Sequence, residues 1–296
     1  GEPVVERIID ALSTVVAGRS RFLVQILERL RDPRAVPALI TLLEQPQLEP
    51  LLIVAIIRAL CQFPDERVVA PLLKILAMPA TLVYEAAIIA LSQLPALTFD
   101  GLVAALDVPQ DTLFTQRVRR ALLLMTPFPG EQLVRALEMP RSEAQAQQIL
   151  QVFQAQGKEA AQVLVQHIQH RDERIREYIY QALENMPGSV VVPALLAALY
   201  QPALRKTIGM FLLKYPATAI PALVGLLGER ERGPFAVELL PQLGPDVLRP
   251  LLVALNDQRS QARDGAQQVI VTLVRRQAGD QLEQTLLDIV HLFYPP

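Results

Sequence analysis

A twelve-residue phrase recurs along this chain and limits it to a repeat architecture. Residues 32–43 read DPRAVPALITLL, and residues 65–76, 33 positions later, read DERVVAPLLKIL. One leucine of the phrase returns at steps of 28 to 35 residues, at Leu39, Leu72, Leu102, Leu133, Leu164, Leu195, Leu223, Leu251 and Leu286. Self-similarity at a period of about 30 residues is typical of a solenoid, in which each repeat is one supersecondary unit.

Each repeat carries the pattern of two short helices. Around most of these leucines the apolar residues stand at i, i+1 and i+4, which is one face of a helix. Several of these helices are expected to open at a proline, which suits a first helical turn: Pro37, Pro71, Pro193, Pro221 and Pro250. A preceding helix ends at a second leucine, usually followed by a breaker such as Pro64, Pro95, Pro187, Pro216 or Gly244.

These patterns predict an all-α fold, because no stretch shows strand alternation bounded by hairpin turns. We expect a right-handed α-solenoid, or superhelix, of eight to nine helical hairpins, with an extra leading helix at about residues 4–16. The 24 prolines are spread as helix punctuation and form no linker, so residues 1–296 are predicted to be a single repeat domain. The first residue is Gly1 and not Met, which indicates a cloning scar or a domain excised from a longer chain.

The recurring phrase resembles the HEAT repeat family, most closely the short form of the phycobilisome lyases. Residues 32–43 are similar to the family's second-helix consensus, and residues 172–176 and 257–263 resemble its inter-repeat Asp and first-helix Arg. The chain departs from the family where proline replaces the Asp-rich turn, at Pro46, Pro79, Pro109, Pro140 and Pro202. The resemblance implies that first helices form a convex face and second helices a concave one. The departures argue against a regular Asp–Arg hydrogen-bond ladder.

Charge and motifs give no sign of catalysis or of nucleic-acid binding. The 28 Lys and Arg residues against 30 Asp and Glu leave a net charge of −2, without a global basic footprint. Serine-hydrolase elbows and phosphate-binding loops are absent from the sequence. No apolar run reaches the length of about 18 residues that a membrane span needs.

The few potential metal ligands do not form a recognisable site. Cys61 is the only cysteine, which excludes an internal disulfide and a thiolate cluster and is compatible with a reducing cytoplasm. His167 and His170 stand three residues apart on one predicted helix, a spacing that can place two nitrogens on a metal. However, the chain has no His-Glu dipeptide, and metal-dependent hydroxylases built on HEAT arrays need several. We therefore predict no catalytic, cofactor-binding or metal-binding residue.

Two surfaces are candidates for partner contacts. The concave ridge of the C-terminal half is predicted to be small or uncharged, and its partner-binding candidates are Gln166, Gln169, Ala197, Tyr200, Gly225 and Asn256. The alternative is that the small residues only permit tight curvature. Helix phase also predicts an apolar patch on the convex side, made of Leu51, Val54, Leu82 and Ile89. The alternative there is that these side chains are buried between hairpins.

The sequence favours a non-catalytic scaffold for protein–protein interaction, which presents a groove lined by the second helix of each repeat. Its partner is expected to be a protein or peptide, with no nucleic acid involved. The second hypothesis, taken from the resemblance, is a HEAT-like enzyme or cofactor-handling protein of the bilin lyase type.

Overall fold

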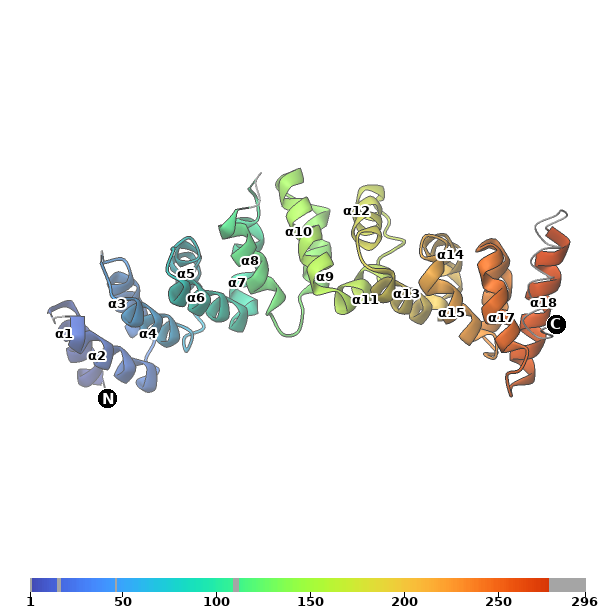
Figure 1. The fold of residues 1–296 in the computed structure, drawn as a ribbon. Coiled ribbons are helices and arrows are strands. Elements are labelled where there is room, and N and C mark those ends of the chain that lie inside the picture. Colours follow the sequence, from blue (N-terminus) through green and yellow to red (C-terminus); the bar gives the residue numbers. More distant parts are fainter. Residues whose placement is uncertain (1, 15–16, 46, 109–111, 277–296) are drawn as a thin grey trace. The chain divides into compact units, whose positions relative to one another are not determined.

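The computed structural model describes residues 2–14, 17–45, 47–108 and 112–276, and all regular structure in that part of the chain is helical. The chain divides into two compact units, Gly1–Glu159 and Ala160–Pro296. Within each unit the helices stack side by side as successive hairpins (Figure 1). The predicted all-helical solenoid is therefore confirmed, while the single repeat domain stays a prediction.

Unit 1 consists of a leading helix followed by hairpins, in which even-numbered first helices alternate with odd-numbered second helices. Its helices are α1 (Glu2–Thr14), α2 (Ala17–Leu30), α3 (Ala35–Leu43), α4 (Pro50–Leu60), η1 (Glu66–Val68), α5 (Val69–Ile75), α6 (Thr81–Gln93), α7 (Pro95–Ala105), α8 (Leu113–Leu123), α9 (Gly130–Glu138) and α10 (Glu143–Gln156). The first helices α2, α4, α6, α8 and α10 pack against one another in order. The leading helix α1 packs on α3, so it lies in the row of second helices.

Unit 2 continues the alternation. Its helices are α11 (Lys158–Gln166, whose first two residues lie in unit 1), α12 (Glu173–Glu184), α13 (Gly188–Ala197), η2 (Ala198–Tyr200), η3 (Pro202–Leu204), α14 (Arg205–Leu212), α15 (Pro216–Leu226), α16 (Gly233–Leu239), η4 (Leu240–Gln242), η5 (Pro245–Val247), α17 (Leu248–Ala254) and α18 (Ser260–Arg276). Second helices α13, α15 and α17 pack in sequence. Eight pairs of consecutive helices, α2–α3 to α16–α17, are complete within the described residues, which agrees with the predicted eight to nine.

The repeated leucines form the central layer of the stack. All eight that lie in the described residues have no exposed surface: Leu39, Leu72, Leu102, Leu133, Leu164, Leu195, Leu223 and Leu251. The ninth, Leu286, lies outside the described residues. Burying one leucine side chain stabilises the folded chain by about 2 kcal/mol, so this position contributes to stability in every repeat where it is described.

Proline sets the helix starts, but not always the proline that the sequence pattern indicates. Pro95 and Pro216 are first residues of α7 and α15, and Pro187 caps α13, as the breaker pattern predicts. The prediction that Pro193 and Pro221 open their helices is wrong, because both lie inside α13 and α15. Each helix already begins at or directly after an earlier proline, Pro216 or Pro187. Because Pro193 and Pro221 have no N–H, each helix loses one internal hydrogen bond.

Several hydrogen bonds between neighbouring parts of the stack end on backbone carbonyls and not on the carboxylates of an Asp–Arg ladder. At the turn before Pro79, Arg117 Nη1 donates to the carbonyls of Leu76 (2.5 Å) and Met78 (2.8 Å). At the turns with Asp, the carboxylate of Asp257 accepts from Arg259 on the same turn, and Arg263 donates to the Asp257 carbonyl (2.8 Å). Pro46 and Pro109 lie outside the described residues.

Candidate functional site

A hollow in unit 1 lies between two second helices, α7 and α9. The backbones of α5 and α7 pack closely, whereas those of α7 and α9 approach each other less closely. The space between them is an open groove of about 520 Å³, which we call the α7–α9 groove. Interiors of folded proteins are close-packed, so a gap of this size on the surface is a candidate binding site.

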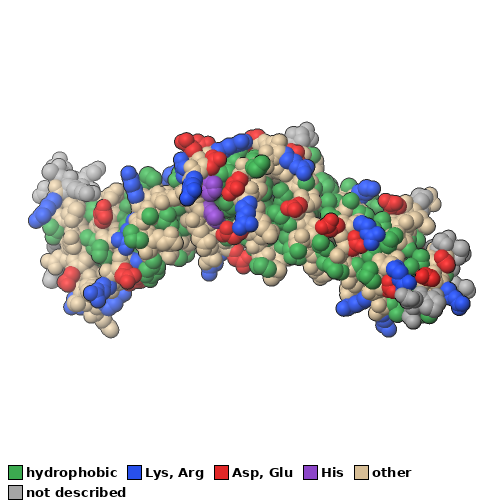
Figure 2. Space-filling view, turned by 180° about the vertical axis from the view of Figure 1, so that it is seen from behind, with side chains coloured by type: hydrophobic (Ala, Val, Ile, Leu, Met, Phe, Trp, Pro, Cys, Tyr) green, Lys and Arg blue, Asp and Glu red, His purple; other side chains and the backbone are tan. Residues whose placement is uncertain are grey.

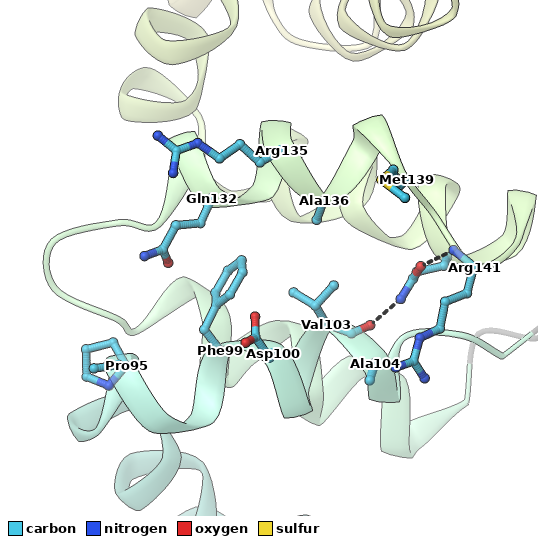
Figure 3. Close-up of a pocket in the computed structure, with 12 residues that line it drawn as sticks. Pro95, Phe99, Asp100, Val103, Ala104, Gln132, Arg135, Ala136, Met139 and Arg141 are labelled. Carbon is cyan, nitrogen blue, oxygen red and sulfur yellow. Dashed lines mark hydrogen bonds between the residues drawn. The ribbon is translucent and has the colours of Figure 1, made fainter.

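Apolar side chains from both helices face each other across the α7–α9 groove. Phe99 and Val103 rise from α7 toward Ala136 on α9 and Met139 at its end (Figure 3). Met139 is 88% exposed, which is unusual for so large an apolar side chain. The walls can therefore accept an apolar group from a ligand without any rearrangement of the core.

One end of the groove is held by a buried glutamine of α10. Gln145, 3% exposed, donates from Nε2 to the carbonyl of Val103 (2.7 Å). Its Oε1 accepts from the backbone N–H of Arg141 (2.7 Å), and both bonds are drawn as dashed lines in Figure 3. A carboxamide with both ends bonded is rigid, so it fixes the separation of the two helices at this end.

Charged side chains stand at the rim of the groove. Arg135 and Arg141 are exposed and come from α9 and from the turn after it, and Asp100 comes from α7 (Figure 3). No hydrogen bond or ion pair to another described residue occupies the side chains of these three residues. The rim thus offers two guanidinium groups, which recognise carboxylates with paired hydrogen bonds.

The predicted partner-binding residues all lie in unit 2, on or beside its second helices. Each of them is exposed: Gln166, Gln169, Ala197, Tyr200, Gly225 and Asn256. A Cβ added at Gly225 would meet nothing within 4 Å, so the surface is open there. Gln169 is less available than expected, because its Nε2 donates to the Ala203 carbonyl (2.8 Å) and ties two repeats together.

Tyr200 is the one aromatic side chain on this predicted surface. It is 56% exposed, and the guanidinium of Arg232 lies 4.8 Å from the centre of its ring. Arg232 also donates to both carboxylate oxygens of Glu229 (2.6 and 2.8 Å), and this hydrogen-bonded carboxylate raises the pKa of the guanidinium. The tyrosine is therefore held on a fixed cation, as an anchor for a partner should be.

The predicted convex patch is only partly exposed. Leu51, Leu82 and Ile89 are 50 to 51% exposed on first helices α4 and α6. Val54 is 9% exposed and does not belong to the surface. It lies at the floor of a groove of about 330 Å³ between α4 and α6, because the close packing of these helices covers the third residue after Leu51.

The side chains that could bind a metal ion are separated from one another or already hydrogen-bonded. The His167 and His170 rings are 6.4 Å apart, and His170 Nδ1 accepts from the Asp172 N–H (3.2 Å). Within the described residues no group of three or more His, Cys, Asp or Glu side chains has the arrangement to hold a metal ion. Burial raises the pKa of the Cys61 thiol to about 11, and Glu28 adds to this shift.

Residues 21–45, which cover most of α2 and all of α3, match the PBS lyase HEAT-like repeat. The chain carries a HEAT-like repeat at residues 21–45. No curated protein matches the chain.

Similar solved structures include an engineered protein (16% identity, TM-score 0.30, covering 93% of this chain and 99% of that one). A designed armadillo repeat protein has 14% identity and a TM-score of 0.31 over 91% and 99% of the two chains. Human deoxyhypusine hydroxylase has 18% identity and a TM-score of 0.29 over 92% and 84%.

Sequence reasoning missed the α7–α9 groove. Its only signal was the glutamine-rich start of α10, since a glutamine that becomes buried, as Gln145 is, must find hydrogen-bond partners in a neighbouring repeat. The separation of two helices is a tertiary property, and no local pattern encodes it. No helix in the described residues is long and apolar enough to cross a membrane.

Proposed function

We propose that this HEAT-like repeat chain is a non-catalytic scaffold that binds a protein or peptide, with the α7–α9 groove as a principal contact surface. The observation that supports this is an open groove with opposed apolar walls and two rim arginines that no other described side chain occupies. Such a groove fits an apolar anchor residue with a carboxylate beside it. The exposed second-helix surface of unit 2, with Gln166, Gln169, Ala197, Tyr200, Gly225 and Asn256, is a second contact surface in this proposal.

The physical character of the surface favours a protein over a nucleic acid. On the face shown in Figure 2, basic and acidic side chains are intermingled, and hydrophobic side chains lie between them. Nucleic-acid binding draws most of its affinity from rows of phosphate-binding cations, whereas a mixed polar surface around apolar contacts is usual for protein partners. The single cysteine is compatible with a cytoplasmic location, which we include in the proposal.

A photo-crosslinking amino acid at position 139 tests the proposal. Met139 is almost fully exposed, so replacing it should leave the fold intact. We expect ultraviolet light to join one stoichiometric protein to position 139 in extracts of the source cells, and Ala136→Glu in the same chain should abolish that product. The matched control places the crosslinker at Leu124, 47% exposed after α8. A product pattern that is the same at both positions, or that survives Ala136→Glu, would contradict the proposal.

A second candidate function is the handling of an open-chain tetrapyrrole. It is favoured by the position of Asp100 among Arg135 and Arg141 in one groove, because a bilin carries two carboxylates and several pyrrole N–H donors. Incubating the purified chain with a free bilin distinguishes the candidates. A red-shifted absorbance band that disappears in an Arg135→Ala, Arg141→Ala double variant would favour the tetrapyrrole, and an unchanged bilin spectrum would exclude it.

A further inference from the structure

We propose that the first-helix face of unit 1 docks an amphipathic helix of a partner protein across a row of three leucines. Leu51, Leu82 and Leu113 follow one another at steps of 31 residues and are 51, 51 and 69% exposed. Each is the first or second residue of its helix, α4, α6 or α8. We call these three residues the leucine row. Single exposed leucines are ordinary, but the same exposed position in three successive repeats forms a contiguous apolar surface.

Contacts between neighbouring first helices fix the leucine row in register. α4 packs on α6, and α6 packs on α8. The guanidinium of Arg117 on α8 lies 3.6 Å from the centre of the Tyr84 ring on α6. One turn further along, Arg120 forms an ion pair with Glu85. These contacts join residues 33 and 35 positions apart, close to the 31-residue step of the leucines, so the starts of α6 and α8 lie near each other.

The spacing of the row selects a helical partner. Packed helices are about 8–10 Å apart, so successive leucines of the row are separated by roughly that distance. Seven residues of an α-helix rise by about 10.5 Å. A partner helix that crosses α4, α6 and α8 therefore sets an apolar residue against each leucine if these residues recur every seven positions. The groove between α4 and α6, with Val54 at its floor and Ile89 at its edge, receives the middle one.

Charges around the row add a preference for a particular partner. The exposed Arg58 lies toward the C-terminal end of α4 and the exposed Glu49 just before its start. Within the described residues neither side chain has an ion pair, whereas Glu85 and Arg120 pair with each other and Arg117 is bound to carbonyls. A partner helix is thus favoured if it carries carboxylates on the flank over Arg58 and an amine on the flank over Glu49, as charged flanks specify pairing in coiled coils.

This site is independent of the α7–α9 groove, because it uses first helices and the groove uses second helices. The probe is a fluorescein-labelled helical peptide of about 20 residues, with leucine at every seventh position, glutamate on one flank and lysine on the other. We expect fluorescence anisotropy to show saturable binding to the intact chain. Leu82→Glu places a charge in the centre of the row and should weaken binding at least about tenfold.

Matched variants separate the docking site from general effects. Val253→Glu makes the same change at an aliphatic residue of α17 that is 75% exposed, and it should leave peptide binding unchanged. Leu113→Glu, at the most exposed leucine of the row, gives a second test if Leu82→Glu lowers the melting temperature. Glutamine in place of the peptide's glutamates should weaken binding to the intact chain but not to an Arg58→Ala variant.

Several results would overturn the proposal. The first is that the intact chain does not bind the peptide. The second is that the Leu82→Glu variant binds the peptide as tightly as the intact chain does. Sedimentation that shows a dimer of the intact chain, lost in Leu82→Glu, would assign the row to contacts between two copies. Flotation with vesicles of phosphatidylcholine and phosphatidylserine that is lost in Leu82→Glu would assign it to a lipid surface.

Discussion

At the scale of single residues, polar side chains in this chain are used to hold repeats together. Arg117, Gln145 and Gln169 each donate to a backbone carbonyl of another repeat. The last carbonyls of a helix have no partner within that helix, and they attract positive charge because of the helix dipole. A long donor side chain from another repeat bonds a backbone carbonyl at the turns of Pro79 and Pro202, neither of which contains an aspartate.

Cys61 gives a residue-scale prediction about reactivity. Burial raises the pKa of its thiol to about 11, so the folded chain holds the proton more tightly than the unfolded chain. At pH 8 we expect iodoacetamide to alkylate Cys61 about 100-fold more slowly in the folded chain than in urea. The stabilising effect of this shift is complete below the unfolded pKa and is lost as the pH rises toward about 11.

Mass spectrometry of the alkylated fraction over time measures both rates. Free cysteine at the same pH serves as the reagent control. Equal rates in folded and unfolded chain would show that the thiol is accessible and that its pKa is unshifted.

At the scale of helices, the packing of α6, α8 and the end of α5 depends on Arg117. Its guanidinium combines two carbonyl hydrogen bonds with a contact over the Tyr84 ring. Arg120, one turn along the same helix, makes an exposed ion pair with Glu85. Hydrogen bonds to a charged donor that is partly buried contribute more than exposed ion pairs do.

We therefore expect Arg117→Ala to lower the free energy of unfolding by about 2 kcal/mol and Arg120→Ala by about 0.5 kcal/mol. Urea denaturation monitored by circular dichroism measures both. The comparison controls for the loss of one positive charge from α8. A similar loss in the two variants would mean that the carbonyl bonds of Arg117 contribute nothing to the stacking.

Helix order and hairpin pairing are the part of the fold that follows directly from the sequence, because the buried leucine and the breaker recur in every repeat. The first residues of α13 and α15 could not be predicted in this way, since each helix has two prolines near its start. In the structure each helix begins at or directly after the earlier proline. Helix phase identified Leu51 and Leu82 as exposed. It failed for Val54, whose burial depends on how closely α4 and α6 approach.

At the scale of the whole molecule, stacking in rows makes the surface a set of repeated positions. The leucine row is visible only when α4, α6 and α8 are compared position by position, and the apolar patch predicted from the sequence does not include Leu113. The α7–α9 groove is the opposite case, a gap between two second helices that pack less closely than α5 and α7 do. Sequence periodicity can indicate a repeated surface position such as the leucine row. It carries no information about a gap between two helices such as the α7–α9 groove.

A stack in which each hairpin touches only its neighbours should also unfold locally. Leu223→Ala removes most of a fully buried side chain from α15 and should cost about 2–5 kcal/mol. We expect hydrogen exchange, followed by mass spectrometry, to accelerate in α13, α15 and α17 and to stay unchanged in α2, α4 and α6. Leu39→Ala in α3 provides the mirror experiment, with loss of protection in unit 1 alone. Uniform loss of protection along the chain in both variants would show that the repeats fold as one cooperative unit, against the nearest-neighbour character of their contacts.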